Sequence, residues 1–257
     1  MNNEIIMQKY FERLSVKPPQ EHVTADSSTL RTLHMRHVMM IPYENKDYLT
    51  GNIKSADFET QFEEVIIKKR GGVCLDMNPL FGEFLKMLGF EVKYYSTVMC
   101  SRPAEDLNFH VILQVGDCDG NLWWCDVANP IMRFIEPLPI KIGEEIDASG
   151  IIFRFEMGPG QKLILREKRE NDYQDIFRIR DSDITVEDRN ESKYGDRERF
   201  PQNAVFCKEV FSIGTPQGRR TLLGNMYTES YPGGLYRYEC SKEMKPWAYS
   251  QFNLLCD

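Results

Sequence analysis

The stretch RGGVCLDMN, residues 70–78, lies between two segments of helical spacing and so sets where one helix ends and the next begins. Residues 57–70 carry apolar side chains at helical spacing and finish in Lys68-Lys69-Arg70, whose charges suit the negative end of a helix dipole. The glycines that follow stop this helix, and residues 80–88 begin a new helical pattern. We therefore expect Cys74 at or near a helix N-terminus, where the partial positive charge favours a thiolate.

A histidine and an aspartate are expected to face each other further along the chain. Residues 109–115 have apolar side chains at every odd position, which predicts a strand with His110 on the face opposite those side chains. Residues 121–127 predict the next strand, and turn-forming residues join the two. A turn centred on Cys118 places His110 opposite Asp126, and facing Cβ atoms in such a pair lie about 4.5–5.5 Å apart. At that distance a carboxylate holds an imidazole.

Cys74, His110 and Asp126 together form a candidate catalytic triad. An imidazolium beside a thiol stabilises a thiolate–imidazolium pair, and a carboxylate fixes the tautomer and orientation of the imidazole. Each residue alone is more often structural, since a buried cysteine usually acts as a small apolar filler. The paired glycines, the helix start and the facing His–Asp pair together favour the catalytic interpretation.

The composition is that of an ordinary globular protein. With 257 residues, of which 42% are hydrophobic and 12% aromatic, the chain is long enough to bury a full core and to divide into two or three subdomains. A net charge of −7 argues against binding to nucleic acid or to anionic membranes. No apolar run reaches the roughly 18 residues of a membrane span. Residues 1–4 lack the basic and apolar regions of a signal peptide, so we expect a cytoplasmic protein.

The seven cysteines predict neither disulfides nor a metal site. Their number is odd, none forms a C-x-x-C pair, and the absence of an export signal predicts reduced thiols. A zinc site built from Cys118, Cys125 and Cys207 has poor spacing. His34 and His37 lie one helical turn apart but have no acidic or cysteine ligand at matching spacing, so core or surface roles are expected.

A change in hydrophobic period along the chain predicts an α+β fold in three parts. Residues 1–89 predict a helical subdomain that carries the candidate nucleophile. Residues 90–200 predict a β-rich subdomain, a small barrel or strongly curved sheet, that carries the histidine and the aspartate. Residues 201–257 predict a small antiparallel C-terminal unit.

Finer expectations follow from local signals. Ser27 or Ser28 is expected to cap the second helix. Residues 181–200 are highly charged, and we interpret them as a solvated helix or linker rather than as an acidic face for a partner. The predicted strands are residues 91–99, 109–115, 121–127, 151–156, 162–168, 176–180, 204–213, 220–227 and 235–240.

Several of these motifs resemble the arylamine N-acetyltransferase family, over nearly the whole chain. The Arg-Gly-Gly-x-Cys block at residues 70–74 is the most specific of them, and Asp76 in the same block stands where the family usually has glutamate. The other similar segments are Asn78, His110-Val111, Asp126-Val127, residues 29–34, His37, residues 41–45 and residues 218–222.

The resemblance implies a cysteine-protease-like Cys-His-Asp core, with the C-terminal unit covering the active site as a lid. It implies ping-pong transfer of an acetyl group from acetyl-CoA, the acyl donor, to an arylamine, a hydrazine or a related amine. No metal, nucleic acid or membrane is implied as a partner. The oligomeric state stays open.

One loop departs from the family pattern in a way that concerns the acceptor. The family usually has Val-Gly-Phe-Gly where this chain has Val127-Ala128-Asn129-Pro130. Asn129 thus replaces an aromatic of the acceptor pocket, and Pro130 fixes φ and lacks an N–H. We expect Tyr43, Asn129 and Phe206 to line the substrate site, although aromatic residues at such positions are more often simply core.

Two other functions are compatible with the same residues. A cysteine hydrolase, either an amidase or a peptidase, uses the same triad and passes the acyl group to water rather than to an amine. A non-catalytic binding module with a vestigial triad is supported only by the altered loop, because all three triad residues are present.

Overall fold

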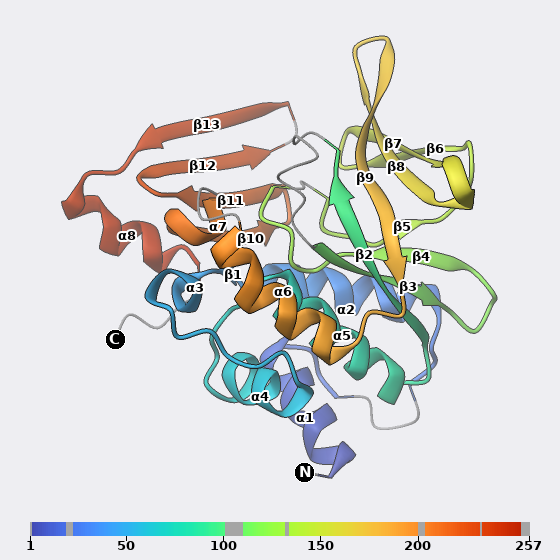
Figure 1. The fold of residues 1–257 in the computed structure, drawn as a ribbon, viewed down its shortest axis with the longest axis horizontal. Helices are drawn as coiled ribbons and strands as arrows, with labels where there is room; N and C mark the ends of the chain where they lie inside the picture. The colour runs from blue at the N-terminus through green and yellow to red at the C-terminus, as the bar shows by residue number, and fades with distance from the viewer. Residues whose placement is uncertain are drawn as a thin grey trace.

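A helical N-terminal part and two antiparallel sheets account for most of the chain that the structure describes (Figure 1). The computed structural model describes residues 2–18, 23–100, 110–131, 134–199, 204–231 and 233–252. Its α-helices are α1 (Asn3–Arg13), α2 (Ser27–Met40), α3 (Lys46–Thr50), α4 (Phe58–Gln61), α5 (Cys74–Met87), α6 (Val186–Arg199), α7 (Ala204–Cys207) and α8 (Lys245–Ser250). Helical segments of other types lie at Phe62–Ile67, Pro159–Gln161 and Lys242–Met244. Among the described residues, no helix has the length and apolar character needed to cross a bilayer.

The larger sheet is strongly curved and almost closes on itself. In the described ranges it has eight strands in the order β5-β4-β3-β2-β9-β8-β7-β6, and its two end strands come into contact. The strands are β2 (Glu91–Met99), β3 (His110–Gly116), β4 (Leu122–Cys125), β5 (Leu138–Pro139), β6 (Glu145–Ala148), β7 (Ile151–Met157), β8 (Leu163–Arg169) and β9 (Asp172–Ser182). The predicted barrel-like middle region is confirmed.

The smaller sheet joins a short strand of the N-terminal part to the strands of the C-terminal part. Its order is β1-β10-β11-β12-β13, and β1, from the N-terminal half, pairs with β10 through Tyr43 and Ser212. The strands are β1 (Tyr43–Glu44), β10 (Val210–Thr215), β11 (Gly218–Leu223), β12 (Met226–Tyr231) and β13 (Gly234–Glu239). The predicted sequence of helical part, β-rich part and small antiparallel unit is confirmed, whereas the predicted boundaries after residues 89 and 200 stay predictions.

The larger sheet is buried on both faces around β3. Val111, Leu113 and Val115 pack against α5 in one cluster, as the odd-numbered pattern predicts. Ile112 lies on the other face, in a second cluster rich in aromatic side chains. His110 is therefore the first residue of a strand that is buried on both faces, and α5 packs directly against that strand.

Two predicted strands of the C-terminal unit are wrong. Residues 204–213 form the short helix α7 followed by β10, and the ring of Phe206 lies 5.8 Å from that of Tyr48. Residues 220–227 form parts of two strands, because Gly224 at φ 61° opens a tight turn between Leu223 and Met226. The Gly-Asn pair in that turn was the local signal. Phe109, in another predicted strand, lies outside the described residues.

The second helix is capped one residue earlier than predicted. Asp26, not Ser27 or Ser28, is the N-cap, and its side chain accepts a hydrogen bond of 2.8 Å from the amide of Thr29. The carboxylate also suits the positive end of the helix dipole.

The charged segment near residue 190, predicted as a solvated helix or linker, is a helix that is not fully solvated. Arg189 and Lys193 of α6 are buried, the latter with only 1% of its surface exposed. Asn190 accepts a hydrogen bond of 2.7 Å from the amide of Ala56. Each of these three side chains has a backbone partner in residues 54–56, more than 130 positions earlier in the chain, so the local charge pattern does not show these contacts.

Candidate active site

Cys74 is the first residue of α5, which confirms its predicted place at a helix start. The two preceding glycines let this part of the chain pass close to β1. A Cβ atom on Gly71 would overlap the carbonyl oxygen of Pro42, and the Gly72 carbonyl accepts a hydrogen bond of 3.1 Å from the amide of Glu44. Any larger residue at Gly71 would push the loop away, so the glycine is needed for the position of Cys74.

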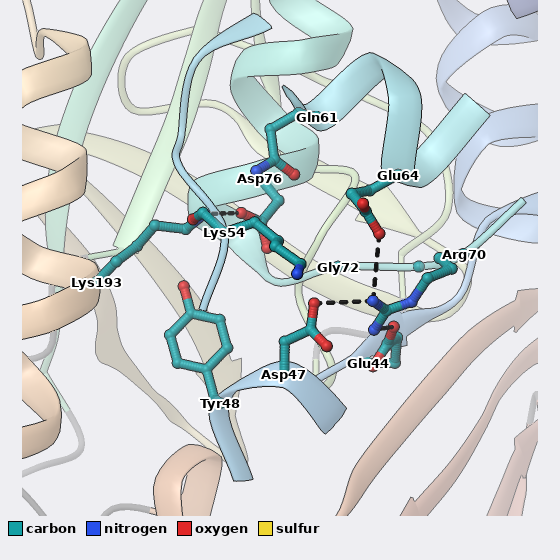
Figure 2. Close-up of a pocket in the computed structure, with 11 residues that line it drawn as sticks. Glu44, Asp47, Tyr48, Lys54, Gln61, Glu64, Arg70, Gly72, Asp76 and Lys193 are labelled. Carbon is teal, nitrogen blue, oxygen red and sulfur yellow. Dashed lines mark hydrogen bonds and ion pairs between the residues drawn. The ribbon is translucent and has the colours of Figure 1, made fainter. Parts of the chain in front are cut away.

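Arg70 anchors the start of the same loop. Its guanidinium pairs with Glu44 at 2.7 Å, Asp47 at 2.8 Å and Glu64 at 3.3 Å, as Figure 2 shows. Burial alone would lower the pKa of Arg70, but these carboxylates raise it above its ordinary value. The loop before Cys74 is thus fixed by charge at one end and by backbone pairing at the other.

His110 and Asp126 meet, although the register predicted for their hairpin is wrong. Leu113 faces Cys125 and Gln114 faces Trp124, so the turn is centred one residue later than predicted. Moving the centre by one residue moves each facing partner by two, which leaves both side chains on the same face of the sheet. Nε2 of His110 lies 2.7 Å from Oδ2 of Asp126, which confirms the predicted contact.

The Asp126 carboxylate is fully surrounded by donors. Besides His110, it accepts hydrogen bonds from Nδ2 of Asn78 at 2.9 Å, Nδ2 of Asn129 at 3.0 Å and the amide of Ala128 at 3.3 Å. Burial raises the pKa of Asp126. The charge of His110 and the hydrogen bonds from His110, Asn78 and Asn129 lower it by more than burial raises it, to about 2. The carboxylate is therefore ionised at neutral pH despite being buried.

Asn78 ties the catalytic helix to both strands that carry the other two residues. Its Nδ2 also donates to the carbonyl of Val111 at 2.7 Å, and its Oδ1 accepts from the amide of Val127 at 2.8 Å. Since every polar atom of this amide has a partner, Asn78 fixes α5 against β3 and against the chain after β4.

Cys74 and His110 complete the arrangement. Burial lowers the pKa of His110, but the charges of Asp126 and Cys74 and hydrogen bonds to both raise it to about 10. Because Nε2 faces Asp126, Nδ1 is the ring atom left for Cys74. The imidazole also stacks on Phe177, with ring centroids 5.2 Å apart. A thiol, an imidazole and a carboxylate therefore lie in a row, and the imidazole is held as a cation.

Sequence reasoning missed two buried groups behind Asp126. Nε2 of His34 accepts a hydrogen bond of 3.1 Å from the amide of Asp126, and Nδ1 of His34 donates to the carbonyl of Ile135 at 2.8 Å. Arg219 is also buried, where burial lowers its pKa to about 10 and the charge of Asp126 opposes that change. His34 and Arg219 both stand in motifs noted above, but no local pattern connects them with Asp126.

The three predicted substrate residues lie in different settings. Tyr43 is buried in β1 and bridges to Gly72, beside the cysteine loop. Asn129 is buried and donates to Asp126, and its Oδ1 accepts from the amide of Ile131 at 3.1 Å. Phe206 is half-buried on α7. Contact of these three with substrate stays a prediction, and Asn129 has in addition a contact within the triad.

A polar pocket lies under the glycine loop (Figure 2). Its volume is about 320 Å³ including its open mouth. It is lined by Glu44, Asp47, Tyr48, Lys54, Gln61, Glu64, Arg70, Gly71, Gly72, Asp76 and Lys193. Across the described ranges, no group of three or more His, Cys, Asp or Glu side chains is placed to hold a metal ion.

His34 gives the fold a specific sensitivity to acid. Burial lowers the pKa of His34 from 6.5 to about 4, so between these values the unfolded chain binds a proton there and the folded chain does not. The free energy of unfolding should therefore fall as the pH drops through this window, by about 3 kcal/mol from this residue. In urea unfolding at neutral pH and near pH 4, His34→Gln should show a drop smaller by about that amount. Equal drops in both proteins would contradict this assignment, since His37, which burial also affects, is present in each.

The chain is similar to known proteins in both sequence and structure. A protein family described as N-acetyltransferase matches residues 26–254. Arylamine N-acetyltransferase 2 of Mesocricetus auratus is 26% identical over 237 residues, covering 85% of this chain and 81% of the relative. Arylamine N-acetyltransferase from Salmonella typhimurium has a similar structure, with a TM-score of 0.83, 23% identity, and coverage of 97% of this chain and 91% of that one. The Mycobacterium marinum arylamine N-acetyltransferase in complex with CoA has a TM-score of 0.80 at 20% identity, covering 91% of this chain and 87% of that one.

Proposed function

The chain belongs to the arylamine N-acetyltransferase family of enzymes, and on this premise we propose that it carries an acetyl group from acetyl-CoA to an amine through a thioester on Cys74. The observation that carries the proposal is the row formed by Cys74, His110 and Asp126. The acceptor class is an arylamine, a hydrazine or a related amine. No metal takes part in the proposed reaction.

In the first half-reaction, the Cys74 thiolate attacks the carbonyl carbon of acetyl-CoA. The tetrahedral intermediate collapses with cleavage of the bond to the CoA sulfur, which takes the proton held on His110. Free CoA leaves, and acetyl-Cys74 remains beside a neutral imidazole. The raised pKa of His110 supports this assignment, because the imidazole is already charged when the thiolate must be stabilised.

In the second half-reaction, the amine attacks the thioester carbonyl. Neutral His110 takes a proton from the amine, the bond to the Cys74 sulfur breaks, and the thiolate–imidazolium pair is restored. Asp126 keeps the imidazole oriented through both halves and stabilises its charged form.

Backbone amides at the start of α5 are the proposed oxyanion donors. Cys74 and Leu75 occupy the first two positions of the helix, where amides have no acceptor within the helix. Amides placed this way stabilise the negative charge that develops on the acetyl oxygen.

The loop after Asp126 is proposed to limit the choice of acceptor. The Pro130 carbonyl accepts hydrogen bonds from the hydroxyls of Ser212 at 3.1 Å and Thr221 at 3.3 Å, so the C-terminal sheet holds this loop in place. Asn129 is turned towards Asp126 and offers no aromatic surface. Loss of a stacking partner weakens binding of a flat aromatic amine by about 0.5–1.5 kcal/mol beyond the lost area.

Intact-mass measurement in two steps tests the function. Brief incubation of the wild-type chain with acetyl-CoA alone should add one acetyl group, since acylation needs only the triad. Addition of a simple aniline should then discharge the group slowly, and a bulkier or more polar amine should do so faster. If no acetyl group is taken up, the proposal fails. If water removes the acetyl group as fast as any amine does, the protein is a hydrolase instead.

A further inference from the structure

Lys193 lies in an unusual position for a lysine. It extends from α6 into the pocket under the glycine loop and reaches Asp76, the third residue of α5 (Figure 2). Its ammonium pairs with Oδ1 of Asp76 and donates to the carbonyl of Lys54 at 2.7 Å. The lysine side chain is 1% exposed and the aspartate side chain 9%. Lysine is almost never fully buried unless it is paired, so the burial of Lys193 depends on its contact with Asp76.

Asp76 is close to the proposed nucleophile. Its Oδ2 accepts a hydrogen bond of 3.0 Å from the amide of Val73, the residue just before Cys74. Burial raises the pKa of Tyr48, and the charges of Asp76 and Cys74 raise it further, so both groups lie near the same hydroxyl. That hydroxyl points into the pocket and has no hydrogen-bond partner among the described residues (Figure 2).

The carboxylate thus has a useful effect and a harmful one. Its hydrogen bond fixes the turn that enters α5 and places Cys74. Its negative charge, however, repels the negative charge of a thiolate at Cys74, which lies in the same first turn of α5. The same helix N-terminus that should stabilise a thiolate already holds this anion.

The other cations of the pocket do not remove this charge. Arg70 is engaged by Glu44, Asp47 and Glu64. Lys54 donates to the side chain of Asn52 at 2.9 Å, at the exposed mouth. Arg189 of α6 feels the charge of Asp76, but its guanidinium donates to the carbonyls of Ala56 at 3.1 Å and Ile184 at 3.4 Å. Within the described chain, Lys193 is the cation that contacts Asp76.

We propose that Lys193 is a positioning residue for the acetyl transfer, acting through Asp76: it cancels the carboxylate charge beside Cys74 and holds that carboxylate on the Val73 amide. The inference rests on the proposed function for its purpose, but its physical content is the state of the Cys74 thiol. Helix α6 thereby connects the β-rich middle of the chain to the reactivity of the cysteine.

Alkylation of Cys74 by iodoacetamide, followed across pH on the full chain and located by peptide mapping, tests this inference without acetyl-CoA. Lys193→Met should slow alkylation at neutral pH by about tenfold or more and move its pH profile upward, because it leaves the charge of Asp76 unneutralised close to Cys74. Adding Asp76→Asn to that variant should restore the rate to within about threefold. Asp76→Asn alone leaves the ammonium near Cys74 and should move the profile downward, which keeps the test decisive if Lys193→Met does not fold.

Asn190→Ala is the matched control. It removes the contact of the same helix with the amide of Ala56 but leaves the Lys193–Asp76 pair intact, and it should keep the wild-type profile. A wild-type profile in Lys193→Met, failure of the second substitution to restore it, or an equal shift in Asn190→Ala would each overturn the inference. An unchanged or upward profile in Asp76→Asn would do so as well. If the wild-type chain takes no acetyl group from acetyl-CoA while the alkylation pattern holds, the proposed function fails and the effect of Lys193 on the Cys74 thiol stands.

Discussion

A Cys74→Ser protein will take up no acetyl group from acetyl-CoA under conditions in which the wild-type chain takes up one. The serine hydroxyl keeps the shape of the side chain, but an imidazolium beside it does not yield an alkoxide at neutral pH as it yields a thiolate. The charge of Asp126, which raises the pKa of His110, remains in the variant, and a charged imidazole is a poor base for an alcohol. Intact-mass measurement after brief incubation gives the occupancy directly, and peptide mapping gives the site.

The remaining cysteines serve as internal controls in that experiment. Cys118 and Cys207 are both exposed. Desolvation and nearby carboxylates raise the pKa of Cys118, and burial raises that of Cys125 well above its ordinary value. An acetyl group that maps to one of these thiols, or that persists in Cys74→Ser, would show that Cys74 is not the nucleophile.

Asp126→Asn should slow the acylation step by about a thousandfold to ten-thousandfold. The amide removes the negative charge that raises the pKa of His110, and it permits the wrong tautomer of the ring. The hydrogen bonds that Asp126 accepts from Asn78 and Asn129 would also lose their charged acceptor. Single-turnover acetylation, followed by mass at several pH values, measures the effect. A rate within tenfold of wild type would mean that Asp126 does not serve the histidine.

Asn129→Leu should slow acylation less than Asp126→Asn does. It keeps the carboxylate and its bond to His110 and removes one donor at 3.0 Å. A hydrogen bond to a charged group contributes about 1.5–3 kcal/mol, so acylation should slow by roughly ten- to a hundredfold. An effect as large as that of Asp126→Asn would assign to Asn129 a part that its geometry does not explain.

The candidate triad could be predicted from the sequence because the patterns that indicate it are local. A helix that stops at two glycines and restarts at a cysteine shows itself in apolar spacing, and Cys74 indeed begins α5. The period of two before Gly116 placed His110 on the correct face. The hairpin register was wrong, but an error of two positions preserves the face, so the contact with Asp126 survived it.

The partners of the buried polar groups could not be predicted from local patterns. The local pattern of α6 showed only a high content of charged residues, and its Lys193 contacts Asp76, which lies far away in the chain. Likewise the departure at Asn129 suggested a lost pocket wall, whereas the structure turns its amide to Asp126.

The sequence by itself therefore determined the succession of a helical part, a β-rich part and a small antiparallel unit, the helix start at Cys74 and the identity of the three candidate catalytic residues. Only the tertiary structure decided the hairpin register, the donors around Asp126 and the counter-charge of Asp76. The physical reason is that hydrophobic period and turn chemistry act between near neighbours in the chain. Satisfaction of a buried charge or amide depends on whichever distant segment is packed against it.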